Sequence, residues 1–125
     1  MTRVLVVNDD PDLVLMCQIV LESAKFQVET TVEAREVDRI VERFAPHVIV
    51  LDWVLDGLTG GDVLARLDER GPPRPPVLVI SALDRVSALS RVLGAEGFLR
   101  KPFTADELID AVQRSRQAGA ARNLV

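Results

Sequence analysis

Polar residues stand at the ends of four short apolar runs in this sequence, where they could together form one reactive site. They are Asn8, Asp9 and Asp10 after residues 4–7, Asp52 after 48–51, Ser81 after 77–80 and Lys101 after 97–99. Three carboxylates, one hydroxyl and one ammonium group suit a hard divalent cation together with a phosphoryl group. Mg²⁺ takes one or two protein carboxylates and fills its other positions with water or substrate oxygens. These residue types therefore indicate a site for Mg²⁺ and phosphate chemistry.

Each of these residues alone has a simpler explanation. An aspartate after a strand often caps a helix or shapes a turn, a serine can cap a helix, and a lysine can be a solvated charge. Their occurrence at four strand ends is what indicates a shared site. No GxxxxGK[ST] or GxGxxG sequence is present, so a nucleotide is not the obvious source of the phosphoryl group.

The elements that must position these residues follow from the apolar pattern. Residues 4–7, 48–51 and 77–80 are unbroken apolar runs typical of strands buried on both faces. Residues 28–31 and 97–99 are weaker strands that complete a set of five. Helical spacing of apolar residues alternates with these strands, at residues 12–23, 33–44, 61–69, 85–93 and 105–117. The last helix follows a capping box of Thr104 and Glu107. This alternation predicts a doubly wound α/β domain, in which ligands bind at the carboxyl ends of the strands.

The composition narrows the class of protein. A chain of 125 residues is most simply one domain, which we expect over residues 1–117, with 118–125 as a frayed tail or the stub of a linker. The net charge of −4 disfavours a nonspecific nucleic-acid binder. No apolar stretch approaches the ~18 residues that span a bilayer, and no signal peptide is visible, so a cytoplasmic location is the default. Cys17, among apolar neighbours, is expected to be a buried and inert thiol.

The sequence also resembles a known family. The segments VLVVNDDPDL, VIVLDWVLDGLTGGDVL, VLVISALD and GAEGFLRKPF are similar, in this order, to those of the receiver domain of two-component response regulators, the CheY-like family. The resemblance covers residues 3–117. It implies a (βα)5 sandwich whose parallel sheet has the strand order 2-1-3-4-5.

The resemblance also implies roles for individual residues. It makes Asp52 the phosphoacceptor, Lys101 the lysine that contacts the phosphoryl group, and Ser81 and Phe98 the pair that switches conformation. For Mg²⁺ it implies direct ligation by Asp9, Asp52 and the backbone carbonyl of Val54, with Asn8 bound through water. Asp10 and Asp56 would lie on the rim of the site.

Two positions depart from the family pattern. Asn8 stands where an acidic residue is usual, so we predict weaker Mg²⁺ binding than in a similar domain with two acids. Asp56 stands where proline is frequent, and it either adds charge near the acceptor or simply forms a turn with Gly57.

The function implied is that of a signalling receiver. Asp52 would take a phosphoryl group from a histidine kinase or phosphotransfer protein, and the domain would act on no external substrate beyond its own phosphorylation and dephosphorylation. A downstream effector protein or domain is implied, and a homodimer through residues 85–93, 97–99 and 105–117 is one option. No nucleic-acid or membrane contact is expected from these residues. Two other classes remain: a pseudo-receiver that takes no phosphate, which Asn8 favours, and a flavodoxin-like FMN carrier, which the acidic residues after the first strand disfavour.

Overall fold

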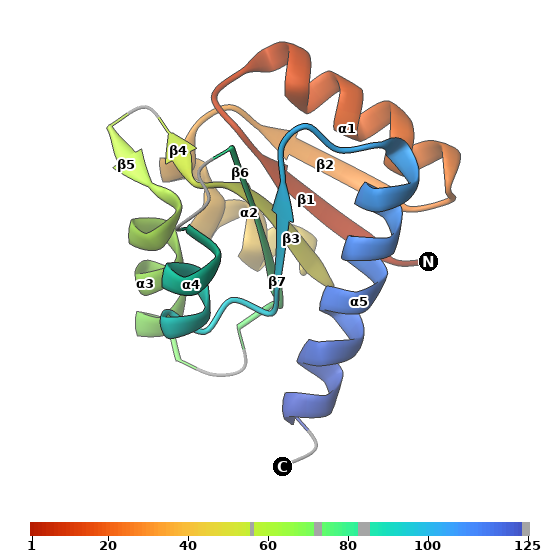
Figure 1. The fold of residues 1–125 in the computed structure, drawn as a ribbon. Helices are drawn as coiled ribbons and strands as arrows, with labels where there is room; N and C mark the ends of the chain where they lie inside the picture. The colour runs from red at the N-terminus through yellow and green to blue at the C-terminus, as the bar shows by residue number, and fades with distance from the viewer. Residues whose placement is uncertain (56, 72–73, 83–85, 124–125) are drawn as a thin grey trace.

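The computed structural model describes residues 1–55, 57–71, 74–82 and 86–123, and its centre is a five-stranded parallel sheet (Figure 1). In spatial order its strands are β2 (Gln27–Thr31), β1 (Arg3–Val7), β3 (Val48–Asp52), β6 (Val77–Ser81) and β7 (Gly97–Arg100). Counted along the sheet-forming strands alone, this order is 2-1-3-4-5, which confirms the predicted fold class. The three central strands β1, β3 and β6 carry the apolar runs, as expected for strands covered on both faces.

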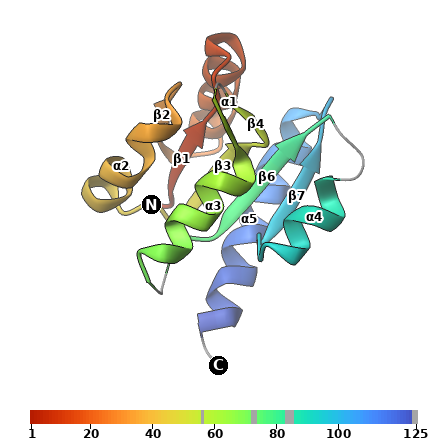
Figure 2. The same ribbon diagram turned by 90° about the vertical axis from the view of Figure 1, so that its left-hand side faces the viewer.

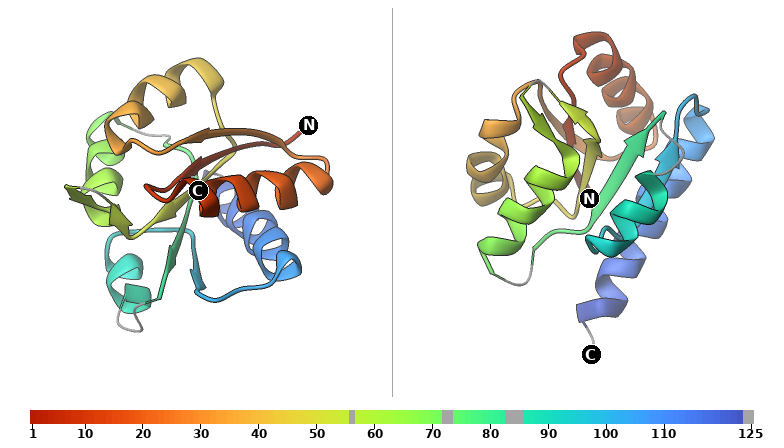
Figure 3. Two further views of the ribbon diagram at one scale, coloured as in Figure 1. Left: turned by 90° about the horizontal axis from the view of Figure 1, so that it is seen from above. Right: turned by 60° about the vertical axis from the view of Figure 1, so that its left-hand side comes forward.

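Helices cover the two faces of the sheet unequally. They are α1 (Pro11–Ser23), α2 (Val37–Phe44), α3 (Gly60–Glu69), α4 (Val86–Val92) and α5 (Ala105–Asn123). Because side chains alternate along a strand, Val4 and Val6 of β1 face the core formed with α1 and α5, whereas Leu5 and Val7 face the core formed with α2, α3 and α4. The view from above in Figure 3 (left) shows these two layers, and Figure 2 shows α3 and α4 in front of the sheet with α5 behind it.

The helix starts follow local hydrogen-bonding rules. The predicted capping box before α5 is confirmed: the Thr104 amide donates to Glu107 Oε1 at 2.8 Å, and the Glu107 amide donates to Thr104 Oγ1 at 3.1 Å. A second capping box, which the pattern of apolar residues did not reveal, joins Thr59 and Asp62 at the start of α3. Both boxes fix the point at which the chain turns from the carboxyl edge of the sheet into a helix.

The structure differs from the sequence prediction in three elements. The helix predicted over 33–44 begins as a short 3-10 helix, η1 (Ala34–Glu36), before α2. The helix predicted over 105–117 continues to Asn123 as α5, and its added part packs closely against Pro76: a Cβ on Gly119 would come 2.1 Å from Pro76 Cγ. A two-residue hairpin, β4 (Val54–Leu55) and β5 (Leu58–Thr59), joins β3 to α3.

Within the part of the chain that the structure describes, no helix combines the length and the apolar character needed to cross a bilayer.

Candidate functional site

The acceptor candidate Asp52 is the last residue of β3. The strands of the sheet end at its upper edge in Figure 1. Its side chain is buried, with the residue 3% exposed, and Lys101 Nζ donates to its Oδ2 at 2.5 Å. Lys101 follows the edge of β7 and is held there by its own amide, which donates to the carbonyl of Ser81 at 3.0 Å. The ends of β3, β6 and β7 therefore bring the carboxylate and the ammonium group together.

Asn8 is the second partner of this carboxylate. Its Nδ2 donates to Asp52 Oδ2 at 2.5 Å, and its Oδ1 accepts from the Asp10 amide at 2.8 Å. Since one neighbour is an acceptor and the other a donor, the orientation of the amide is determined. The Val54 amide donates to the other oxygen, Asp52 Oδ1, at 3.1 Å. One ammonium group and two neutral N–H groups thus compensate the Asp52 charge.

The two aspartates after Asn8 have different surroundings. Asp10 is exposed and caps α1, with its Oδ1 accepting from the Asp12 amide at 3.0 Å. Asp9 is also exposed, and within the described ranges its carboxylate has no hydrogen bond or ion pair. Asp9 therefore is an exposed carboxylate next to Asn8 in the chain, with no bond inside the described part of the protein. Asp56, expected on the rim, lies outside the described residues.

Ser81 and Phe98, the predicted switch pair, lie on neighbouring strands. Ser81 ends β6 and is 1% exposed. Phe98 lies in β7 opposite Val79 and packs, half-buried, against the core that contains Trp53 and Val86 of α4. Phe98 therefore packs against the core that α4 also covers, and its change of rotamer stays a prediction.

Two further buried residues, Cys17 and Trp53, lie close to Asp52. Cys17 of α1 is fully buried, as expected, and burial raises the pKa of its thiol to about 11, with Lys101 acting to lower it and Asp52 to raise it. Trp53, next to the acceptor, is 9% exposed. A Cβ on Gly61 would lie 2.9 Å from Trp53 Cη2, so the Gly60–Gly61 pair at the start of α3 makes room for the indole ring. In the sequence, this pair of adjacent glycines is the feature that indicates close packing of a large side chain at the start of α3.

The donor set suits a hard cation. The residues predicted to hold Mg²⁺ have suitable chemical types, since Asp9 and Asp52 are carboxylates and the Val54 carbonyl is a neutral oxygen, whereas Asn8 turns its Nδ2 toward Asp52. No group of three or more His, Cys, Asp or Glu side chains with metal-binding geometry occurs among the described residues.

Comparison with known proteins identifies the family. The family model described as "Response regulator receiver domain" matches residues 4–113. The C4-dicarboxylate transport transcriptional regulatory protein DctD of Pseudomonas aeruginosa is 34% identical over 115 residues, covering 91% of this chain and 25% of DctD. The transcriptional regulatory protein KdpE of Mycobacterium tuberculosis is 36% identical over 113 residues, covering 87% of this chain and 48% of KdpE. The solved receiver domain of the Francisella response regulator 1452 is similar with a TM-score of 0.85 and 27% identity, covering 94% of this chain and 98% of that one.

The chain belongs to the response regulator receiver domain family of two-component systems, which confirms the resemblance read from its sequence. It spans a quarter to a half of the length of the curated relatives named here. The family assignment therefore applies to a receiver domain and not to the other domains of these relatives.

Proposed function

We propose that Asp52 accepts a phosphoryl group from a phosphohistidine of a partner kinase or phosphotransfer protein. An oxygen of the Asp52 carboxylate attacks phosphorus, the P–N bond to the imidazole breaks, and the imidazole nitrogen keeps the electron pair. The product is an acyl phosphate, which is open to hydrolysis and lets the domain reset itself. Such a transfer depends on positioning and on neutralising the phosphoryl oxygens far more than on acid–base chemistry.

One observation carries this proposal: a buried carboxylate at a strand end that is paired directly with an ammonium group. Asp52 is held by Lys101 and by N–H groups of Asn8 and Val54, so it is kept in one orientation. When a phosphoryl group forms on Asp52, the Lys101 ammonium is already within reach of its oxygens. Because the side chain of Lys101 is 31% exposed, it can follow the new group without unfolding its strand.

Mg²⁺ is the cofactor that fits the donor set, with Asp9, Asp52 and the Val54 carbonyl as its protein ligands. When bound, the ion would neutralise part of the charge of the phosphoryl oxygens, in addition to the Lys101 ammonium. The resemblance implies that Asn8 binds the ion through a water molecule, but here its Nδ2 donates a hydrogen bond directly to Asp52. This supports weakened metal binding, because the ion must compete with that hydrogen bond.

The output surface proposed is the face of α4, β7 and α5. Leu89 and Val92 of α4 are 47% and 83% exposed, so this short helix shows apolar side chains that its own core does not use. Movement of Ser81 toward the phosphoryl oxygens would free space for Phe98 and change this face. Its binding partner would be an effector or a second copy of the chain.

The test is to incubate the protein with acetyl phosphate and Mg²⁺ and to weigh the intact chain. We expect a gain of one phosphoryl group that is lost in Asp52→Asn. The matched control is Asp10→Asn, which removes a nearby carboxylate but keeps the cap of α1, since asparagine caps as well as aspartate. A gain that persists in Asp52→Asn, or that disappears in Asp10→Asn alone, would contradict the assignment.

The second candidate is a pseudo-receiver that binds partners without taking phosphate. The Asn8–Asp52 hydrogen bond favours it, because a neutral amide occupies the acceptor oxygen where an acid would help to recruit the ion. If no mass gain occurs at any Mg²⁺ concentration, this candidate replaces the first.

A further inference from the structure

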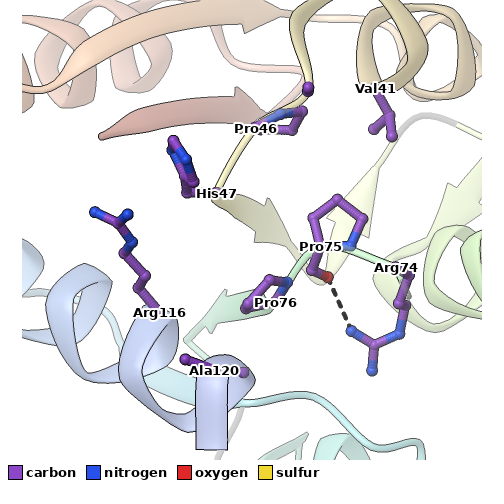
Figure 4. A pocket seen from close by; sticks show the side chains of 10 residues that line it. Val41, Pro46, His47, Arg74, Pro75, Pro76, Arg116 and Ala120 are labelled. Atoms are coloured by element: carbon purple, nitrogen blue, oxygen red, sulfur yellow. Dashed lines mark hydrogen bonds between the residues drawn. The ribbon is translucent and has the colours of Figure 1, made fainter. Parts of the chain in front are cut away.

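A pocket of about 470 Å³ lies at the amino-end edge of the sheet, opposite the site of Asp52 (Figure 4). One wall comes from the loop before β3, with Pro46 and His47, and a second from Pro75 and Pro76 before β6. The third is α5, whose Gly119 lies against Pro76. A hollow of this volume is within the range of small-molecule sites, and the rigid proline rings mean that it is formed before any ligand arrives.

His47 presents a hydrogen-bond donor that the protein does not use. Its Nδ1 accepts from the Arg3 amide at 2.9 Å, so the neutral ring carries its proton on Nε2. In the described part of the chain no acceptor is bonded to Nε2. The ring is fixed as well, because the His47 amide donates to the Arg3 carbonyl at 2.8 Å.

Arg116 of α5 supplies an unneutralised cation on the same side of the hollow, as Figure 4 shows. Its guanidinium donates to Thr2 Oγ1, but no carboxylate lies within 4 Å of it in the described ranges. The other cation of the pocket, Arg74, is different: Asp68 and Glu96 pair with it at 2.6 and 2.5 Å, and it donates to the Pro75 carbonyl. The ion pairs of Arg74 therefore hold one wall of the pocket in place, whereas the charge of Arg116 is available to a ligand.

The charge of this region is opposite to that of the whole chain. The chain carries a net charge of −4, yet the residues that line the pocket include no aspartate or glutamate. Burial, Arg116, Arg3 and the N-terminal ammonium all lower the pKa of His47, which places three cations near this imidazole. A ligand that enters here meets apolar proline surface and a local positive field.

We propose that this pocket binds a small organic carboxylate, with its apolar body against Pro46, Pro75 and Pro76 and its carboxylate on Arg116 and the His47 Nε2–H. A guanidinium–carboxylate contact can be bidentate, which selects a planar anion over a neutral isostere. The ligand would join the end of α5 to the base of the sheet. The site needs neither Mg²⁺ nor phosphorylation, so its test is independent of the function proposed above.

The experiment is an NMR titration of the full chain at constant ionic strength with benzoate and with hexanoate, each compared with its neutral amide. We expect saturable shifts at the His47 ring and at Gly119 and Ala120 with the carboxylates only. A bound anion also favours the imidazolium, so the pKa of His47 should rise on saturation.

Two arginines on α5 give a matched pair of variants. Arg116→Gln should weaken carboxylate binding about tenfold or more, the range expected when a charged hydrogen bond is lost. Arg114→Gln, which removes an exposed arginine paired with Asp110 outside the pocket, should leave the affinity unchanged. Equal affinity for acid and amide, no saturable shift with either acid, or full affinity in Arg116→Gln would each overturn the proposal.

Discussion

The replacement of Asn8 by aspartate should strengthen Mg²⁺ binding, and the gain in binding free energy can be calculated from the geometry of the site. Asn8 and Asp52 are 1% and 3% exposed, and their side chains touch at 2.5 Å. A new carboxylate ~6 Å from the ion, at an effective dielectric of ~40, attracts it by roughly 332×2/(40×6), or about 3 kcal/mol before desolvation. After that cost, we expect Asn8→Asp to bind Mg²⁺ about 10–100 times more tightly.

The same change should destabilise the protein when no ion is present. Asn8→Asp removes an N–H donor from a buried carboxylate and sets a second carboxylate beside it, at a cost of ~1.5–3 kcal/mol of unfolding free energy. Saturating Mg²⁺ should restore more stability to the variant than to the wild type, because a ligand that binds only the folded state stabilises it by its affinity.

The assay for both effects uses Trp53, the only tryptophan and the neighbour of Asp52. Its fluorescence is followed during Mg²⁺ titration, and urea unfolding is measured with and without the ion. Gln113→Glu, on the exposed surface of α5, controls for an added charge elsewhere. Equal Mg²⁺ affinities for the wild type and Asn8→Asp would refute the electrostatic reasoning.

Two further predictions concern stability. Ser115 Oγ is buried without a hydrogen-bond partner in the described residues, and a Cβ on Gly97 would come 2.2 Å from it. Gly97→Ala should therefore lower the urea midpoint of unfolding, and adding Ser115→Ala should restore most of the loss although it costs little alone. Additive effects of the two substitutions would argue against this contact. The pKa of His47 is lowered in the folded protein from its ordinary value of 6.5, so the unfolded state binds more protons near that pH. The stability of the protein should therefore fall as the pH drops through 6.5 and below. His47→Gln should reduce this dependence of the melting temperature on pH, and an unchanged dependence would contradict the reasoning.

Most of the fold could be predicted because local pattern and global burial agree. The unbroken apolar runs at 4–7, 48–51 and 77–80 can be satisfied only by strands covered on both faces, and the intervening helical stripes supply that cover. The misjudged ends have physical causes too. The last turns of α5 carry no apolar stripe, although Gly119 there packs against Pro76. The 3-10 helix η1 interrupts a pattern of apolar residues that appeared continuous in the sequence.

The residues of the site could be predicted from the sequence, but the hydrogen bonds between them could not. Parallel strands end at one edge, so polar residues placed after them in the sequence must come close together in space. This reasoning brings Asp52 and Lys101 together, and the ion pair between them agrees with it. Which way the Asn8 amide turns could not be known in advance, because it depends on whether its neighbours donate or accept.

The amino-acid sequence by itself determined the order of strands and helices and the residues that gather at the carboxyl edge, since both depend on the spacing of residue types along the chain. Only the tertiary structure decided that Asn8 donates to the acceptor, that Trp53 packs against a pair of glycines, and that His47 and Arg116 line one pocket at the opposite edge. Each arrangement depends on how separate elements pack against one another, so its geometry exists only once the helices have packed against the sheet.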